Sequence, residues 1–167
     1  MQRPEPKIKM LVEQYDLLVK LMRGKPESPA NIAAKKVLVH GVKIRDAIED
    51  SGIKRDSVYK AIKRYSDAHD QAVEAFRENH LPDVFDLIVS LTRGNPKAPT
   101  TLAARSIILY GKAINQMQLA ELTPNALPQA VSRYRAAIEE ISKHYSMHSS
   151  LGETINPPKN PESARKD

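Results

Sequence analysis

Basic and hydroxyl side chains are concentrated between residues 54 and 65. This stretch carries five basic residues and one acidic residue, Asp56, so its net charge is +4. Guanidinium and ammonium groups pair with phosphates, and an arginine such as Arg55 can bind O6 and N7 of guanine, which is worth about 1 to 3 kcal/mol of discrimination. A solvated helix surface could have the same composition, but we expect a DNA contact from Lys54, Arg55, Ser57, Tyr59, Lys60, Lys63 and Arg64.

A second group of polar side chains follows about 70 residues later and carries fewer charges. Asparagine and glutamine amides suit N6 and N7 of adenine, whereas the first group suits phosphates and guanine. One group could therefore supply more of the specificity and the other more of the salt-dependent affinity. The alternative is a degenerate copy kept for dimerisation. The candidate DNA-binding residues here are Thr123, Asn125, Gln129, Ser132, Arg133 and Arg135.

The first group lies on a predicted helix from about Lys54 to Glu78. Its apolar residues recur at helical spacing and form an inward stripe, which consists of Val58, Ala61, Ile62 and Tyr65. A short helix from about Ile44 to Asp50 precedes it, and the turn between them, residues 51–53, contains Gly52. Two helices joined by a tight turn with glycine predict a helix-turn-helix, in which the second helix enters the major groove of DNA.

The second group has a similar but less regular setting. We expect a short helix at Ile114 to Glu121, a turn at residues 122–124 and a last helix that runs to about Ser146. Pro128 would break a helix interior, at a cost of about 3 kcal/mol. If Asn125 is the N-cap, however, Pro128 falls in the first turn, where its missing amide has no intrahelical partner.

Each of these pairs follows two further predicted helices. Apolar residues recur at steps of three and four from Ile8 to Met22, and we expect Gly24 to close that helix. Ser28 can cap the next helix, whose first position suits Pro29 and which we expect to continue to Gly41. The same pattern, a proline at the helix start and a glycine at its end, recurs from Pro99 to Gly111.

These parallels reflect an internal duplication. Residues 16–34 return as residues 86–104, an offset of 70, and residues 61–65 match residues 130–134 at an offset of 69. We therefore predict an all-α protein with two tandem helix-turn-helix domains of about four helices each, arranged as a pseudo-dimer. The first domain spans residues 7–79, the second 80–147, and residues 148–167 form a flexible tail. Domains this small bury little surface, so we expect the copies to pack together or the chain to form a homodimer.

Composition excludes several classes of function. The chain of 167 residues has no cysteine, a net charge of +6 and no apolar run that suits a membrane span or a signal peptide. It has no glycine-rich phosphate loop, and adjacent acidic residues point apart on a helix. His144 and His148 have a metal-compatible spacing but lack a convincing third ligand. We expect a cytoplasmic, nucleoid-associated protein that is not an enzyme and uses no cofactor, metal, membrane or small-molecule ligand.

Both copies resemble one family of regulators. Residues 34–41 and 48–64, and likewise 103–111 and 122–139, are similar to the TrfB (KorA-like) transcriptional repressors of broad-host-range plasmids. PapB-type regulators of pilus operons share a looser form of the motif. The resemblance implies sequence-specific operator binding and repression. Members of this family usually have one such domain and dimerise through a further C-terminal segment.

This chain departs from the family pattern in two ways. It fuses two domains, and it divides the family's motif between them. The turn motif Leu-Thr-Arg-Gly is Ile53-Lys-Arg-Asp56 in the first copy and Leu122-Thr-Pro-Asn125 in the second, so only the first keeps the arginine. The second keeps the glutamine, Gln129, where the first has Lys60. Base contacts implied by the resemblance are therefore partial for each copy.

The sequence thus predicts a DNA-binding regulator, a repressor of a plasmid, mobile-element or pilus-type operon, whose partner is double-stranded DNA. Two recognition helices would enter adjacent major grooves, with half-sites about one helical turn apart in the same or opposite orientation. The alternative is a helical adaptor that binds another regulator, with DNA binding weak or lost in one copy. Replacing Arg55, Lys60 and Arg64 by alanine would separate the two hypotheses.

Overall fold

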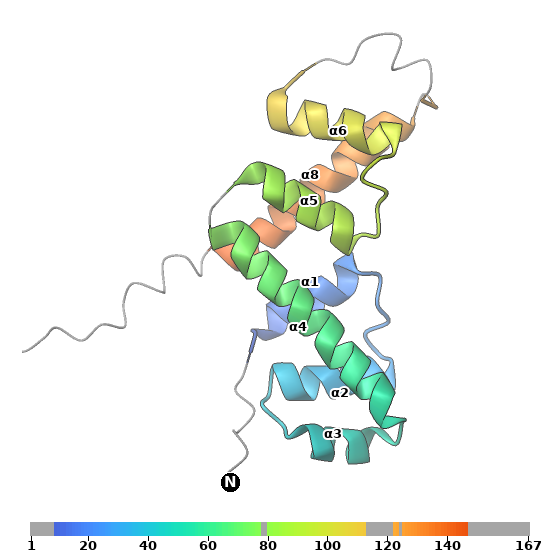
Figure 1. Cartoon of the computed structure of the whole chain (residues 1–167), viewed down its shortest axis with the longest axis vertical. Coiled ribbons are helices and arrows are strands. Elements are labelled where there is room, and N and C mark those ends of the chain that lie inside the picture. The colour runs from blue at the N-terminus through green and yellow to red at the C-terminus, as the bar shows by residue number, and fades with distance from the viewer. Residues whose placement is uncertain (1–8, 78–79, 113–121, 124, 147–167) are drawn as a thin grey trace, which may run out of the picture.

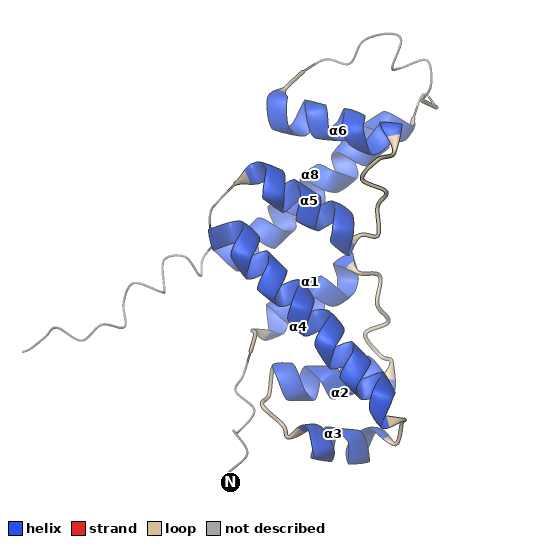
Figure 2. Ribbon diagram, viewed as in Figure 1, coloured by secondary structure: helices blue, strands red, loops and turns tan. Residues whose placement is uncertain are grey.

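The protein is all-helical. The computed structural model describes residues 9–77, 80–112, 122–123 and 125–146, and no strand occurs among them (Figures 1 and 2). No helix of this described part is long and apolar enough to cross a membrane. The predicted helix at 114–121, His148 and the tail at 148–167 lie outside the described residues. The helices are α1 (Val12–Leu21), α2 (Pro29–Leu38), α3 (Ile44–Ser51), α4 (Arg55–Arg77), α5 (Leu81–Leu91), α6 (Pro99–Tyr110) and α8 (Ala126–Tyr145).

Helices α3 and α4 agree with the prediction to within one residue at each end. Gly52 lies between them with φ of 63°, in the left-handed region that glycine adopts at no steric cost. In the second copy, Asn125 stands at the N-cap of α8 as predicted, but its side chain makes no capping hydrogen bond. Pro128 falls in the first turn of α8, which explains why that helix tolerates it.

The prediction for α1 was wrong at both ends. The helix begins at Val12, well after Ile8, and Gly24 is not the residue that reverses the backbone at its end. Arg23 is that residue, with φ of 52°. The amide of Arg23 donates to the carbonyl of Lys20 at 3.1 Å, and the amide of Gly24 donates to that of Val19 at 2.8 Å. This pair of bonds is the Schellman motif, with arginine at the position where glycine is usual.

The residues that begin and end α2 and α6 agree in part with the prediction. Ser28 accepts a hydrogen bond from the amide of Asn31 at 3.3 Å, and Pro29 occupies the first turn. Helix α2 ends at Leu38, so the expectation that it continues to Gly41 was wrong; Gly41 has a left-handed φ of 65° just beyond the end. Gly111 caps α6 directly, with φ of 62°.

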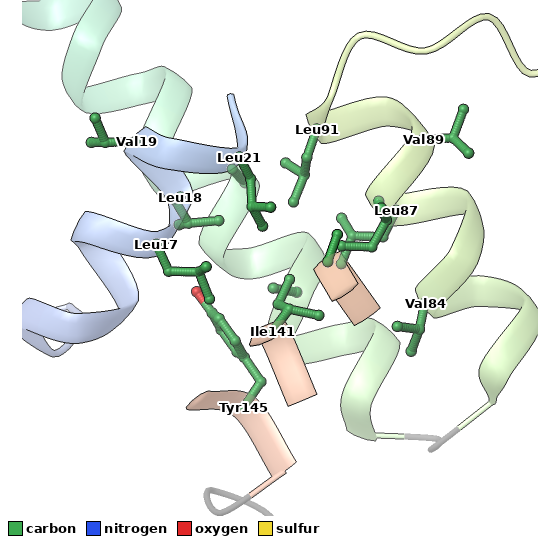
Figure 3. Packing of buried hydrophobic residues seen from close by; sticks show 14 of the residues in the cluster. Leu17, Leu18, Val19, Leu21, Val84, Leu87, Val89, Leu91, Ile141 and Tyr145 are labelled. Carbon is green, nitrogen blue, oxygen red and sulfur yellow. The ribbon is translucent and has the colours of Figure 1, made fainter. Parts of the chain in front are cut away.

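The two copies share one hydrophobic core. Apolar side chains of α1, α4, α5 and α8 form a continuous buried cluster. Figure 3 shows its centre, where Leu17 and Leu21 of α1 lie opposite Leu87 and Leu91 of α5, with Tyr145 of α8 below them. Burial of this apolar surface, at about 25 cal/mol per Å², holds the copies together.

The pairing across this core follows an approximate two-fold axis. Phe76 of α4 and Tyr145 of α8 occupy equivalent positions at the offset of 69, and their rings stack on each other with centroids 6.0 Å apart. Leu21 and Leu91 are likewise equivalent, at the offset of 70, and face each other (Figure 3). Contact between equivalent residues is what a two-fold interface requires. As a result, α4 and α8 meet near their C-terminal ends and begin at opposite ends of the molecule (Figure 1).

Candidate nucleic-acid interface

A small second core fixes the start of α4 against α2 and α3. Val58 is fully buried and packs with Val37 and Ala47, and Ile48 and Ile62 cover the group from its edges. These contacts come from three helices, so the orientation of the first turns of α4 is determined by packing as well as by the turn at Gly52. The opposite side of α4 is therefore held toward solvent.

The predicted candidate residues of the first copy lie on that solvent side. Val58 and Tyr65 are buried, as the inward stripe predicted, and the polar positions between them point outward. Arg64 is half-buried. The exposed candidates are Lys54, Arg55, Ser57, Tyr59, Lys60 and Lys63.

Arg55 and Tyr59 act as a pair on this surface. The guanidinium carbon of Arg55 lies 5.1 Å from the centre of the Tyr59 ring, and its Nη2 donates to the phenol oxygen at 3.3 Å. Stacking restricts the rotamers of Arg55 and orients its planar donor fork. An ordered guanidinium loses less conformational entropy when it binds a base edge or a phosphate.

Two of the predicted residues have internal partners. Nη2 of Arg64 donates to the carbonyl of Met22 at 2.8 Å, and the guanidinium lies 5.5 Å from the centre of the Tyr65 ring. Lys63 pairs with Asp67 one turn along α4, with 3.1 Å between Nζ and Oδ2. Arg64 thus joins α4 to the end of α1, whereas Lys63 is exposed and is paired only within α4.

The remaining cations at the start of α4 are not neutralised. Among the residues that the structure describes, no carboxylate lies within 4.0 Å of the side-chain nitrogens of Lys54, Arg55 or Lys60. Unpaired cations keep their full charge for an anionic ligand. Many lysines and arginines on the rest of the surface are paired instead: Lys9 with Asp70, Lys20 with Glu140, Lys35 with Asp16, Lys36 with Asp50, Arg77 with Glu74, Arg105 with Asp86 and Lys143 with Glu139.

The candidates of the second copy are all exposed, on or just before α8. Arg133, the equivalent of Arg64, lies over the ring of Tyr134 with its guanidinium carbon 4.8 Å from the ring centre. The structure brings this set together on one end of the molecule. It consists of Thr123, Asn125, Gln129, Ser132, Arg133 and Arg135.

An open apolar depression of about 500 Å³ adjoins these residues, between α6 and α8. Ile107, Leu127 and Val131 line it, and they are the equivalents of Val37, Val58 and Ile62, which pack against α3 in the first copy. Ser132 and Arg135 also line it. The surface that α3 covers in the first copy thus has a counterpart in the second.

Buried tyrosines support the framework of both copies. Tyr15 donates to the carbonyl of Asn31 at 2.7 Å, and the hydroxyl of Tyr145 lies 3.0 Å from Nδ1 of His69. Burial raises the pKa of each of these phenols above its ordinary value. Burial also raises the pKa of Tyr65, and the positive charges of Arg64 and Arg93 act in the opposite direction.

Sequence reasoning missed several exposed cations. Lys43 is the N-cap of α3 and Arg45 lies in its first turn, where a first helix can brace the DNA backbone. Arg23 and Arg93 are exposed at the left-handed ends of α1 and α5, with φ of 52° and 54°. The signal for the last two was present, because the Arg-Gly pair is identical in both copies.

The described part of the chain holds no group of three His, Cys, Asp or Glu side chains that could bind a metal ion. Comparisons with protein-family models, with curated proteins and with solved structures found no match to this chain.

Proposed function

We propose that this chain is a sequence-specific DNA-binding transcriptional regulator, a repressor of a plasmid, mobile-element or pilus-type operon. The observation that carries the proposal is the set of exposed, unpaired cations at the start of α4, beside the turn at Gly52. Lys54, Arg55 and Lys60 project from a part of α4 whose other side is packed into a small core. A helix held this way can enter the major groove without rearrangement, which is the geometry of a helix-turn-helix.

The arrangement of the copies supports two half-sites in inverted orientation. The approximate two-fold axis passes between Phe76 and Tyr145, and an operator mirrors the symmetry of the protein that reads it. The half-sites would differ, because the first copy presents cations and the second presents amides such as Gln129. One chain would then read a whole operator.

Helix lengths limit the spacing of these half-sites. His69 and Tyr145 are in contact. Arg55 lies 14 residues before His69, or about 21 Å of helix, and Ala126 lies 19 residues before Tyr145, or about 29 Å. Allowing about 10 Å for the helix contact, the two starts are at most about 60 Å apart. Two turns of DNA need about 70 Å, so the proposed spacing is one turn, about 34 Å.

The test is selection of bound fragments from a random DNA pool, followed by salt titration of the selected site. We expect an inverted pair of unlike half-sites and a steep fall of affinity with salt. Replacing Lys54, Arg55 and Lys60 by glutamine should lower the slope of log K against log salt by about 2.7. Arg64 is left in place, because it holds the carbonyl of Met22.

A matched control removes the same charge from elsewhere. Lys20, Arg77 and Lys143 are each exposed and each paired with a carboxylate. Their replacement by glutamine should leave the slope within about 0.5 of the original, because they lie outside the proposed interface. No enriched sequence, or binding indifferent to salt, would overturn the proposal.

The absence of an enriched sequence, or binding indifferent to salt, would favour the adaptor hypothesis. One observation supports that hypothesis. Ile32 of α2 and Leu102 of α6 are equivalent residues and are exposed by 47% and 52%. Exposed apolar side chains at matching positions suit a helical partner on each copy. Binding of a partner protein that survives the loss of Lys54, Arg55 and Lys60, but not of Ile32 and Leu102, would support it.

A further inference from the structure

Two short loops connect the ends of α1 and α5 to the helices that follow, and each carries an Arg-Gly pair at its second and third positions. We call residues 22–28 and 92–98 the Arg-Gly loops. Arg23 and Arg93 are exposed, and neither forms an ion pair with a carboxylate in the described part of the chain. The loops also carry Lys25 and Lys97, both exposed, against one acidic residue, Glu27.

Both arginines occupy a conformation that disfavours them. Arg23 has φ of 52° and Arg93 has φ of 54°, where glycine or asparagine is usual. The backbone around them is the same in both copies, since Arg93 donates to the carbonyl of Ser90 at 3.1 Å and Gly94 to that of Val89 at 2.8 Å. The strained arginine therefore persists in two copies that differ at many other positions, which indicates a use for its side chain.

The loops lie where DNA between two half-sites would pass. Figure 1 shows the ends of α1 and α5 meeting at mid-height, and the two loops running from there along the side of the molecule on which α4 and α8 begin. The loops therefore lie between the two recognition helices, near the approximate two-fold axis. When two major grooves one turn apart face a protein, the minor groove faces it midway between them.

We propose that Arg23 and Arg93 enter the minor groove at the centre of the operator. This inference rests on the proposed function and adds a third contact to it. Arginines are attracted to a narrow minor groove, whose negative potential is strongest in runs of A·T pairs. Because the two loops are related by the approximate two-fold axis, equivalent side chains from both would approach the same short segment of DNA. The protein then discriminates among operators by base pairs that neither recognition helix touches.

The experiment varies only the central base pairs of an operator whose selected half-sites are kept constant. We expect the wild-type chain to bind an A·T centre about five- to tenfold more tightly than a G·C centre of the same length. The variant R23N/R93N should bind both centres with equal affinity. Asparagine tolerates a positive φ, so this variant should remain folded. Its salt slope should fall by about 1.8, which corresponds to two lost charges.

The control variant is R77Q/K143Q, which removes two cations from the far ends of α4 and α8. It should keep the five- to tenfold preference for the A·T centre. Equal binding of both centres by the wild-type chain, or an unchanged preference in R23N/R93N, would overturn the inference and leave the proposed function intact. Failure to select any half-site would instead overturn the proposed function.

The same variants also test whether Arg23 and Arg93 serve only to stabilise the fold. A cation at the C-terminal end of a helix interacts favourably with the helix dipole. If this were the only role, R23N/R93N would unfold at lower denaturant concentration and yet keep the preference for the A·T centre. That combination would also overturn the inference.

Discussion

The hydroxyl of Tyr65 occupies the space beside Gly24 that a side chain would need. A Cβ on Gly24 would lie 2.5 Å from Oη of Tyr65 and 3.2 Å from a methyl group of Val19. Tyr65 is fully buried and its ring packs at a tilt of 57° against that of Tyr15, with centroids 5.0 Å apart, so the ring cannot simply swing away. Gly24 is thus required by the close approach of α4 to the end of α1.

Gly24→Ala should therefore destabilise the fold by about 1 to 3 kcal/mol, because the overlap with Tyr65 forces a shift of packed groups. Denaturant unfolding measures the loss. The same substitution in a Tyr65→Phe background should cost at least about 1 kcal/mol less, since the overlapping oxygen is gone. An equal cost in both backgrounds would contradict the overlap.

The second copy offers a graded comparison. A Cβ on Gly94 would lie 3.0 Å from Oη of Tyr134, a milder overlap. Gly94→Ala should therefore cost less than Gly24→Ala by about 1 kcal/mol in unfolding free energy. A larger cost at Gly94 would show that the hydroxyl contact does not determine the effect.

Arg64→Gln should lower the unfolding free energy by about 1 to 3 kcal/mol, because the carbonyl of Met22 loses a charged donor. Arg133→Gln, at the equivalent position, should cost no more than about 1 kcal/mol, because Arg133 is exposed and mainly loses its contact with Tyr134. Thermal or denaturant unfolding of both variants provides the measurement. Equal losses would show that the bond to Met22 contributes nothing.

Arg55→Lys should separate specificity from charge. Lysine keeps the positive charge but lacks the planar fork and the stacking that orient Arg55 on Tyr59. Discrimination between the selected site and one with a changed base should fall by about 1 to 3 kcal/mol, while the salt slope stays the same. Competition binding with single-base variants tests this. If discrimination between bases did not change, Arg55 would contact a phosphate and not a base edge.

The two copies should unfold in one cooperative transition, because one buried cluster joins them. Phe76→Ala should shift that whole transition by about 3 to 5 kcal/mol, since it empties space beside Tyr145 in the shared core. Chemical denaturation followed by circular dichroism and by tyrosine fluorescence gives two probes. Transitions that separate, or a variant that destabilises one copy alone, would contradict this prediction.

Stability should fall at alkaline pH. Burial raises the pKa of Tyr15, Tyr65 and Tyr145, so their contribution is complete below the unfolded value of about 10 and is lost as pH rises above it. Each group adds a slope of up to about 1.4 kcal/mol per pH unit. Tyr15→Phe should make the slope of unfolding free energy against pH shallower. A slope that does not change would indicate that Tyr15 already ionises in the folded state.

Much of the helical framework could be predicted from the sequence. The stripe of Val58, Ala61 and Tyr65 predicts α4, because burial at helical spacing determines which side of a helix faces the core. Pro29 and Gly111 likewise mark helix ends by their own backbone preferences. The exposed positions of Lys54, Arg55 and Lys60 follow from the same periodicity.

Other features depend on contacts between distant residues, which periodicity does not contain. The sequence suggests that Gly24 ends α1, whereas Arg23 takes the left-handed conformation and Gly24 makes room for Tyr65. By helical spacing, Arg64 lies on the same side of α4 as the exposed Lys60, yet its guanidinium donates a hydrogen bond to the carbonyl of Met22. The role of Gly24 and the role of Arg64 both depend on the packing of α1 against α4.

The sequence by itself determined the duplication, the approximate positions of the described helices and the two unlike sets of polar residues, since these depend on residue type and local spacing. The tertiary structure decided how the copies are joined, because that depends on which apolar surfaces are mutually complementary. Stacking of Phe76 on Tyr145 sets the two copies about an approximate two-fold axis and brings the Arg-Gly loops between the starts of α4 and α8. A repeat in the sequence does not specify how its two folded copies are oriented relative to each other; the core that they bury together does.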